Sequence, residues 1–218
     1  MSDELRHALP NSIRVTSSGA DFYVEFIPLT GVGRYRAQAA ANGLPGDVLD
    51  FTDATDSSFD VLGPMPSLTA ASQLVIHNLG TLDGDAYNGN NRRSGMVFNA
   101  ANSVLSFTPN GAFPSDSPSA RFAVVESPIS FACIGGAAGS GSLHRLSGYG
   151  HQAMQPVSLA AAPLTSASSN LLATGVTSCA AQMDAALQNL GLLTLRLVLA
   201  RGEGAATLVQ QLAVETTP

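Results

Sequence analysis

Leucine recurs at every second position from 193 to 199, and Thr194, Arg196 and Val198 stand between the leucines. A β-strand places alternate residues on one face, whereas a helix would scatter this pattern around its axis. Residues 206–214 follow after a Gly-rich turn at 201–204, with Leu208, Leu212 and Val214 on the same inner face. This stretch therefore predicts a C-terminal β-hairpin with one apolar face, as in an antiparallel sheet packed on other structure.

The rest of the chain after residue 12 is also dominated by strand patterns separated by Gly, Pro, Asn and Asp. Large polar loops are expected at 40–58, 80–95 and 109–119. The expected strands lie at residues 13–15, 21–29, 34–37, 59–62, 73–79, 97–98, 104–107, 121–125, 129–134 and 143–149. No internal repeat and no linker divides this region, so we expect one β-rich domain over 13–218.

The N-terminal residues have a different, helical spacing, with Leu5, Ala8 and Leu9 on one side before Pro10. A helix this short is marginal by itself in water. It is either an ordinary short terminal helix or the remainder, over residues 1–12, of a longer helix. We expect an α+β fold in which this helix packs on the antiparallel sheet, with Leu5 and Leu9 as its interface.

Composition narrows the possible functions. Charged residues make up only 12% of the chain, the formal net charge is −6, and there is no lysine. Binding of nucleic acid through a basic patch is therefore not expected. No apolar run reaches the roughly 20 residues that cross a bilayer, and no signal peptide is visible. If the protein is exported, its targeting segment is expected upstream of Met1.

Cys133 and Cys179 are the only cysteines. The low charge and the abundance of Ser, Thr, Asn, Gly and Ala are typical of exported β-rich proteins, in which a cysteine pair usually forms a disulfide. The alternative is two buried free thiols.

Catalytic and cofactor motifs are lacking. Without lysine there is no Walker A loop and no Schiff-base lysine, and the four histidines have no zinc-binding spacing. One loop, with Asp83, Asp85 and Asn88, offers oxygen ligands for calcium but departs from the EF-hand pattern. Solvated carboxylates and Asx-turns are the alternative. We expect no enzyme, no cofactor and, apart from this weak calcium candidate, no metal.

Several stretches, in order along most of the chain, resemble the MshO family of minor pilins, which take part in biogenesis of the MSHA pilus. They are residues 5–15 (LRHALPNSIRV), 24–28 (VEFIP), 33–36 (GRYR), 58–63 (SFDVLG), 78–80 (NLG), 85–87 (DAY), 172–179 (LATGVTSC), 191–197 (GLLTLRL) and 202–203 (GE). More distantly the chain resembles the J-type pseudopilins of type II secretion. The cleavage site and hydrophobic helix of such proteins are not in this sequence.

The resemblance implies a pilin-like fold and a non-enzymatic subunit that primes a type IV pilus or sits at its tip, where it could also contribute to surface adhesion. Its partners would be other minor and major pilins. A hydrophobic helix missing here would hold it in the inner membrane, facing the periplasm, before it joins the extracellular pilus. An extracellular adhesin or ligand-binding module that uses the 80–95 loop is the main alternative function, a J-type pseudopilin is the third, and an enzyme is the remaining rival.

Overall fold

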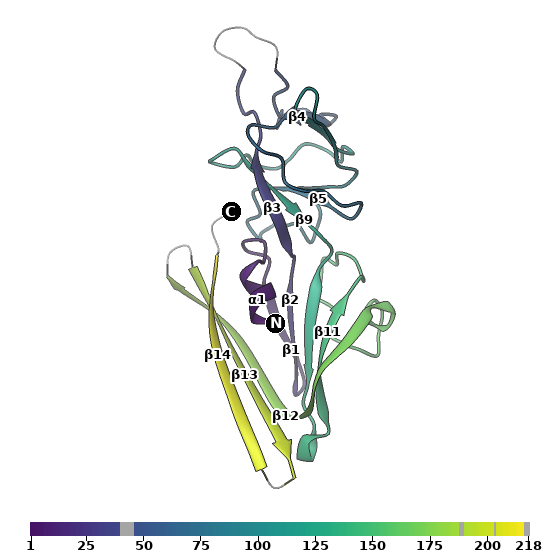
Figure 1. Cartoon of the computed structure of the whole chain (residues 1–218), viewed down its shortest axis with the longest axis vertical. Coiled ribbons are helices and arrows are strands. Elements are labelled where there is room, and N and C mark those ends of the chain that lie inside the picture. The colour runs from purple at the N-terminus through teal and green to yellow at the C-terminus, as the bar shows by residue number, and fades with distance from the viewer. Residues whose placement is uncertain (40–45, 188–189, 203, 216–218) are drawn as a thin grey trace. The chain divides into compact units, whose positions relative to one another are not determined.

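The computed structural model describes residues 1–39, 46–187, 190–202 and 204–215 (Figure 1). The chain forms two compact units. The first combines Met1–Pro28 with Ser127–Thr217, and the second is essentially Leu29–Glu126. A compact unit is not a domain until it is shown to fold alone, so the single domain over 13–218 stays a prediction.

The expected α+β, pilin-like fold is wrong, because the chain is mostly β, with a curled seven-stranded antiparallel sheet. Among the described residues the only α-helix is α1, Ser2–Arg6, joined by two short 3-10 turns, η1 (Ala137–Gly139) and η2 (Leu164–Ser166). The helix ends before the expected Leu9, since a residue that precedes proline is disfavoured in the helical conformation. The Leu9 amide instead donates to the carbonyl of Ile27 at 2.8 Å.

The first unit contains one seven-stranded antiparallel sheet in the order β1-β2-β10-β11-β12-β13-β14. The strands are β1 (Arg14–Ser18), β2 (Asp21–Phe26), β10 (Ile129–Ile134), β11 (Gly141–Ser147), β12 (Ser168–Leu187), β13 (Leu190–Arg201) and β14 (Gly204–Glu215). The predicted C-terminal hairpin is thus present as β13 and β14, paired from Leu190 with Glu215 to Arg201 with Gly204. The tip of its expected turn, Glu203, lies outside the described residues.

The long strand β12 belongs to two parts of this sheet. Its first half pairs with β11 as far as Val176, opposite Gly141, and its second half pairs with β13. The backbone bends at Gly175, whose φ of +80° suits glycine and where a Cβ would lie 2.9 Å from the carbonyl oxygen of Ala200. Beyond the bend β12 approaches β2 and β10, so the sheet curls back on itself (Figure 1).

The curl creates two facing layers. We call β1, β2, β10 and β11 with the first half of β12 the first layer, and the second half of β12 with β13 and β14 the second layer. Leu5 of α1 packs between them and is 1% exposed. The core around it contains Val24, Phe26, Ile129 and Phe131 of the first layer and Leu193, Leu212 and Val214 of the second layer.

The leucine stripe of β13 becomes more open along the strand. Leu193 is fully buried and faces Leu212 of β14, whereas Leu195, Leu197 and Leu199 are only half-buried. Leu208, which pairs with Leu197, is 59% exposed. The four leucines share one face of β13 as predicted, but only Leu193 at one end of the strand is buried in the core.

The second unit is built around aromatic rings. One four-stranded antiparallel sheet has the order β3-β9-β5-β6, and a three-stranded sheet has the order β4-β8-β7. Their strands are β3 (Leu29–Arg34), β9 (Arg121–Val125), β5 (Gln73–Ile76), β6 (Arg92–Arg93), β4 (Ser58–Asp60), β8 (Val104–Ser106) and β7 (Val97–Asn99). Phe59 lies at the centre, with its ring centroid 5.4 Å from that of Phe122 and 6.0 Å from that of Phe107.

Candidate functional site

An apolar slot opens between the two layers of the first unit, with a cavity volume of about 180 Å³. Its walls are mostly large apolar side chains, because the facing strands turn alternate residues inward. The first layer contributes Phe22, Val24, Phe131 and Leu143, and the second layer contributes Leu195, Leu197 and Leu208.

The N-terminal end of α1 lies at this slot. Met1 and Ser2 line it, and the Ser2 hydroxyl donates to Gln210 Oε1 of β14 at 2.5 Å. Leu5, one turn further on, is already closed in by both layers. The slot therefore continues the space that α1 occupies, past its first residue, between the same two layers.

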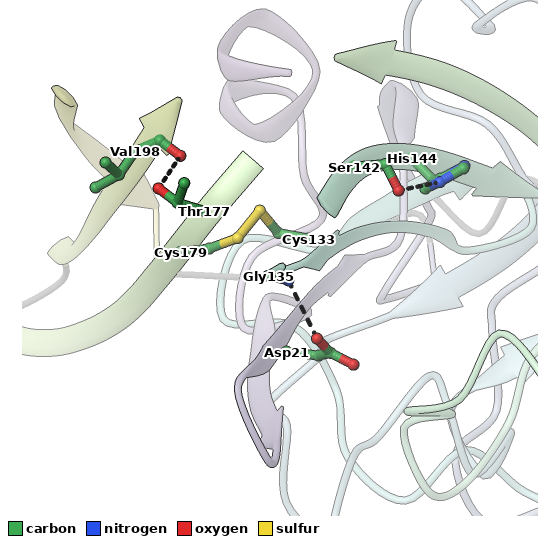
Figure 2. The surroundings of a disulfide bond; sticks show 8 residues. All are labelled: Asp21, Cys133, Gly135, Ser142, His144, Thr177, Cys179 and Val198. Atoms are coloured by element: carbon green, nitrogen blue, oxygen red, sulfur yellow. Dashed lines mark hydrogen bonds between the residues drawn. A yellow bond between two sulfur atoms is a disulfide. The ribbon is translucent and has the colours of Figure 1, made fainter. Parts of the chain in front are cut away.

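The predicted disulfide between Cys133 and Cys179 is confirmed. It joins β10 to β12 with a Cα–Cα distance of 6.3 Å, and both cysteines line the slot. Figure 2 shows the strands on either side of the bond held by further contacts. The Gly135 amide donates to Asp21 Oδ1 at 3.2 Å, and the Thr177 hydroxyl donates to the carbonyl of Val198 at 3.1 Å. The disulfide therefore ties one layer to the other.

The slot is suited to apolar contacts. Arg196 is the only ionisable side chain among its lining residues, and Ser2 and Gln210 are its other polar side chains. Apolar walls of this kind favour burial of aliphatic or aromatic groups, at about 25 cal/mol for each Å² of apolar surface removed from water.

Leu5 and Leu9, the predicted interface residues of the helix, are buried in the first unit itself, at 1% and 3% exposure. Leu5 packs against both layers. Neither side chain is available to another molecule in this conformation.

A buried polar network in the first unit was not anticipated from the sequence. Glu25 of β2 is fully buried, accepts from Arg14 Nε at 2.5 Å, and accepts from the Tyr149 hydroxyl at 2.7 Å. Burial raises the pKa of the Glu25 carboxyl, and hydrogen bonding and charge from Arg14 oppose this. Burial and the charge of Glu25 also raise the pKa of Tyr149. The one sequence signal is a charged residue between Val24 and Phe26; its partners, 11 and 124 residues away, are brought together only by the fold.

The calcium candidate has partners of its own. Asp85 Oδ1 accepts from the amide of Tyr87 at 2.9 Å, which is an Asx-turn, and Asp85 Oδ2 accepts from Asn88 Nδ2 at 2.8 Å. Asp83 is exposed. In the described part of the chain no three His, Cys, Asp or Glu side chains gather as a metal site would need. The Asx-turn alternative describes this loop.

The same loop is anchored by Arg93, which sequence reasoning also missed. Its side chain is 2% exposed and donates to the carbonyls of Asn90 at 3.0 Å and Gly111 at 2.8 Å. The guanidinium carbon lies 4.1 Å from the ring centroid of Phe113. Arg93 thus holds the 80–95 loop against the 109–113 segment, and these hydrogen bonds go to backbone carbonyls of the same unit.

Within the described residues no helix is long and apolar enough to cross a membrane.

Comparison of this chain with protein-family models, with curated proteins and with solved structures found no match.

Proposed function

We propose that this chain is a non-enzymatic minor pilin, a subunit that primes a type IV pilus of the MSHA type or occupies its tip. The observation that carries the proposal is the apolar slot at the N-terminal end of α1. A hydrophobic helix that continued α1 in the N-terminal direction would lie between the two layers and contact the apolar side chains of both walls. The resemblance of the sequence to minor pilins supports the same function.

The remaining features are compatible with this role. The disulfide suits the oxidising periplasm and cell exterior. Filament assembly is non-covalent, so it requires apolar and polar surfaces and no catalytic group. The proposed partners are other minor and major pilins, and the proposed route is from the inner membrane to the extracellular pilus.

Neighbouring residues of β14 provide a matched test. Leu208 faces the slot and Val209 faces the opposite side of the strand, at nearly equal exposures of 59% and 58%. The full-length gene is deleted in its host and replaced by a copy that encodes either Leu208→Asp or Val209→Asp. Surface pili are then counted by electron microscopy. We expect few pili with Leu208→Asp, because a carboxylate in an apolar slot opposes helix burial, and normal pili with Val209→Asp.

A normal number of pili in the deletion strain would disprove the proposal. A normal number of pili with Leu208→Asp would also disprove it. The melting temperatures of the two purified variants serve as the control for folding. Because both side chains are already exposed, both variants should melt close to the unsubstituted protein.

A further inference from the structure

The outer edge of β14 has no partner strand among the described residues, since β14 is the last strand in the sheet order. It is a long edge, Gly204–Glu215, and its first six residues are exposed. Between Gly204 and Val214 there is no charged residue and no proline. In an antiparallel sheet every second residue of an edge strand directs its N–H and C=O outward. Only another strand satisfies such a row of groups in register.

The opposite edge of the same sheet is protected. β1 has only five residues, and Arg14 donates from its guanidinium to the carbonyls of Gln152 at 2.7 Å and Ala153 at 2.8 Å. The Thr16 hydroxyl donates to Gln155 Oε1 at 2.7 Å. The 152–155 segment is thereby held along β1. The chain uses the usual devices against edge pairing at β1 and lacks them at β14.

We propose that β14 pairs antiparallel with β14 of a second copy of this chain, forming a two-fold dimer with a continuous sheet. A head-to-tail contact would need the β1 edge, which is short and occupied, so two copies meet through β14 alone. Such a contact uses the same surface on both copies and closes at two. This inference does not depend on the pilin proposal.

The side chains of the edge are compatible with themselves. Antiparallel pairing places the two Glu215 carboxylates at opposite ends of the contact, so no like charges face each other. Small residues at 204–206 allow close approach of the backbones, and the exposed Val209 gains a cross-strand neighbour. The contact is small, so we expect a weak dimer. Each copy carries a net charge of −6, and added salt screens this repulsion and should tighten the dimer.

One cross-strand row provides a matched pair of variants. Thr207 of β14 pairs with Val198 of β13, which pairs with Ser178 of β12, so the three share a face. Thr207 and Ser178 are both exposed, but only Thr207 is at the edge. Thr207→Lys places a lysine on the pairing edge of each copy, where a charge opposes strand pairing, whereas Ser178→Lys makes the same charge change inside the sheet.

The experiment is sedimentation velocity of the chain from micromolar to millimolar concentration, at low and at moderate salt. We expect a dimer fraction that rises with concentration and salt, at least a tenfold weaker dimer for Thr207→Lys, and an unchanged dimer for Ser178→Lys. A monomer throughout the range would overturn the proposal. Equal dimerisation of the two variants would also overturn it, because the contact would then lie elsewhere. Binding of β14 to a strand of another pilus subunit, with no dimer, would replace the second copy by that partner.

Discussion

Removal of the disulfide tests the two-layer description of the first unit most directly. Cys133 and Cys179 are 46 residues apart in sequence, and they connect strands that belong to different layers. In the chain-entropy model, opening a loop of this length costs roughly 4 kcal/mol at 25 °C. We therefore expect the double variant Cys133→Ala/Cys179→Ala to lose about that much free energy of unfolding. Alanine is chosen because it adds no polar group to this largely apolar site.

Urea denaturation followed by far-UV circular dichroism measures the effect. With a slope of about 2–3 kcal/mol per M for a chain of this size, the midpoint should fall by roughly 1.3–2 M. Hydrogen exchange should show the loss in β10, β12 and β13 of the first unit, while the amides of β5 and β9 in the second unit keep their protection. Reduction of the unsubstituted protein with dithiothreitol should reproduce the shift.

A loss of unfolding free energy below about 1 kcal/mol would contradict this reasoning. It would mean that other contacts keep the two layers together, or that the unfolded chain retains structure without the disulfide. Equal loss of protection in both units would also contradict it, because the disulfide lies wholly in the first unit.

Two further predictions concern the same unit. Leu193→Ala should lower the free energy of unfolding by about 2–5 kcal/mol because Leu193 is fully buried between the layers. Leu197→Ala should lower it less, since Leu197 is only half-buried. Equal losses in urea denaturation would contradict the opening of the slot along β13. Burial raises the pKa of Glu25 above its ordinary value of 4.5, so the folded state holds the proton more tightly than the unfolded state. The stability that this proton contributes is present below about pH 4.5 and is lost as the pH rises through the raised pKa. The free energy of unfolding relative to Glu25→Gln should therefore decrease over that range in urea titrations, and a difference that is independent of pH would refute it.

Local patterns predicted the hairpin well. The alternation at 193–199 is a property of residues two apart, and it survives in any environment that offers one apolar side, so β13 and β14 could be recognised without knowledge of their partners. The cysteine pair was similarly informative, because only one pairing exists within the chain. The helix was overestimated, since helical spacing at Leu5, Ala8 and Leu9 outweighed the effect of Pro10 on the residue before it.

The candidate site depends on contacts that no local pattern contains. The slot exists because β12 continues past the end of β11 and bends at Gly175. How far β12 extends beyond β11 depends on the pairing of the whole sheet. Glu25 is buried because Tyr149 and Arg14 reach it from other strands or loops. The burial of Arg93 against Phe113 became visible only in the folded second unit.

By itself the sequence determined the strand period, the hairpin, the available disulfide and the lack of lysine-dependent chemistry, because each of these depends on residue type or on spacing along one segment. Tertiary structure alone decided that the sheet curls into two layers with Leu5 between them, and that Leu208 lines an open slot while Leu193 is closed. These outcomes follow from which strands end first and which surfaces then meet, and the contacts that stabilise them join residues far apart in the sequence, such as Leu5 and Leu193.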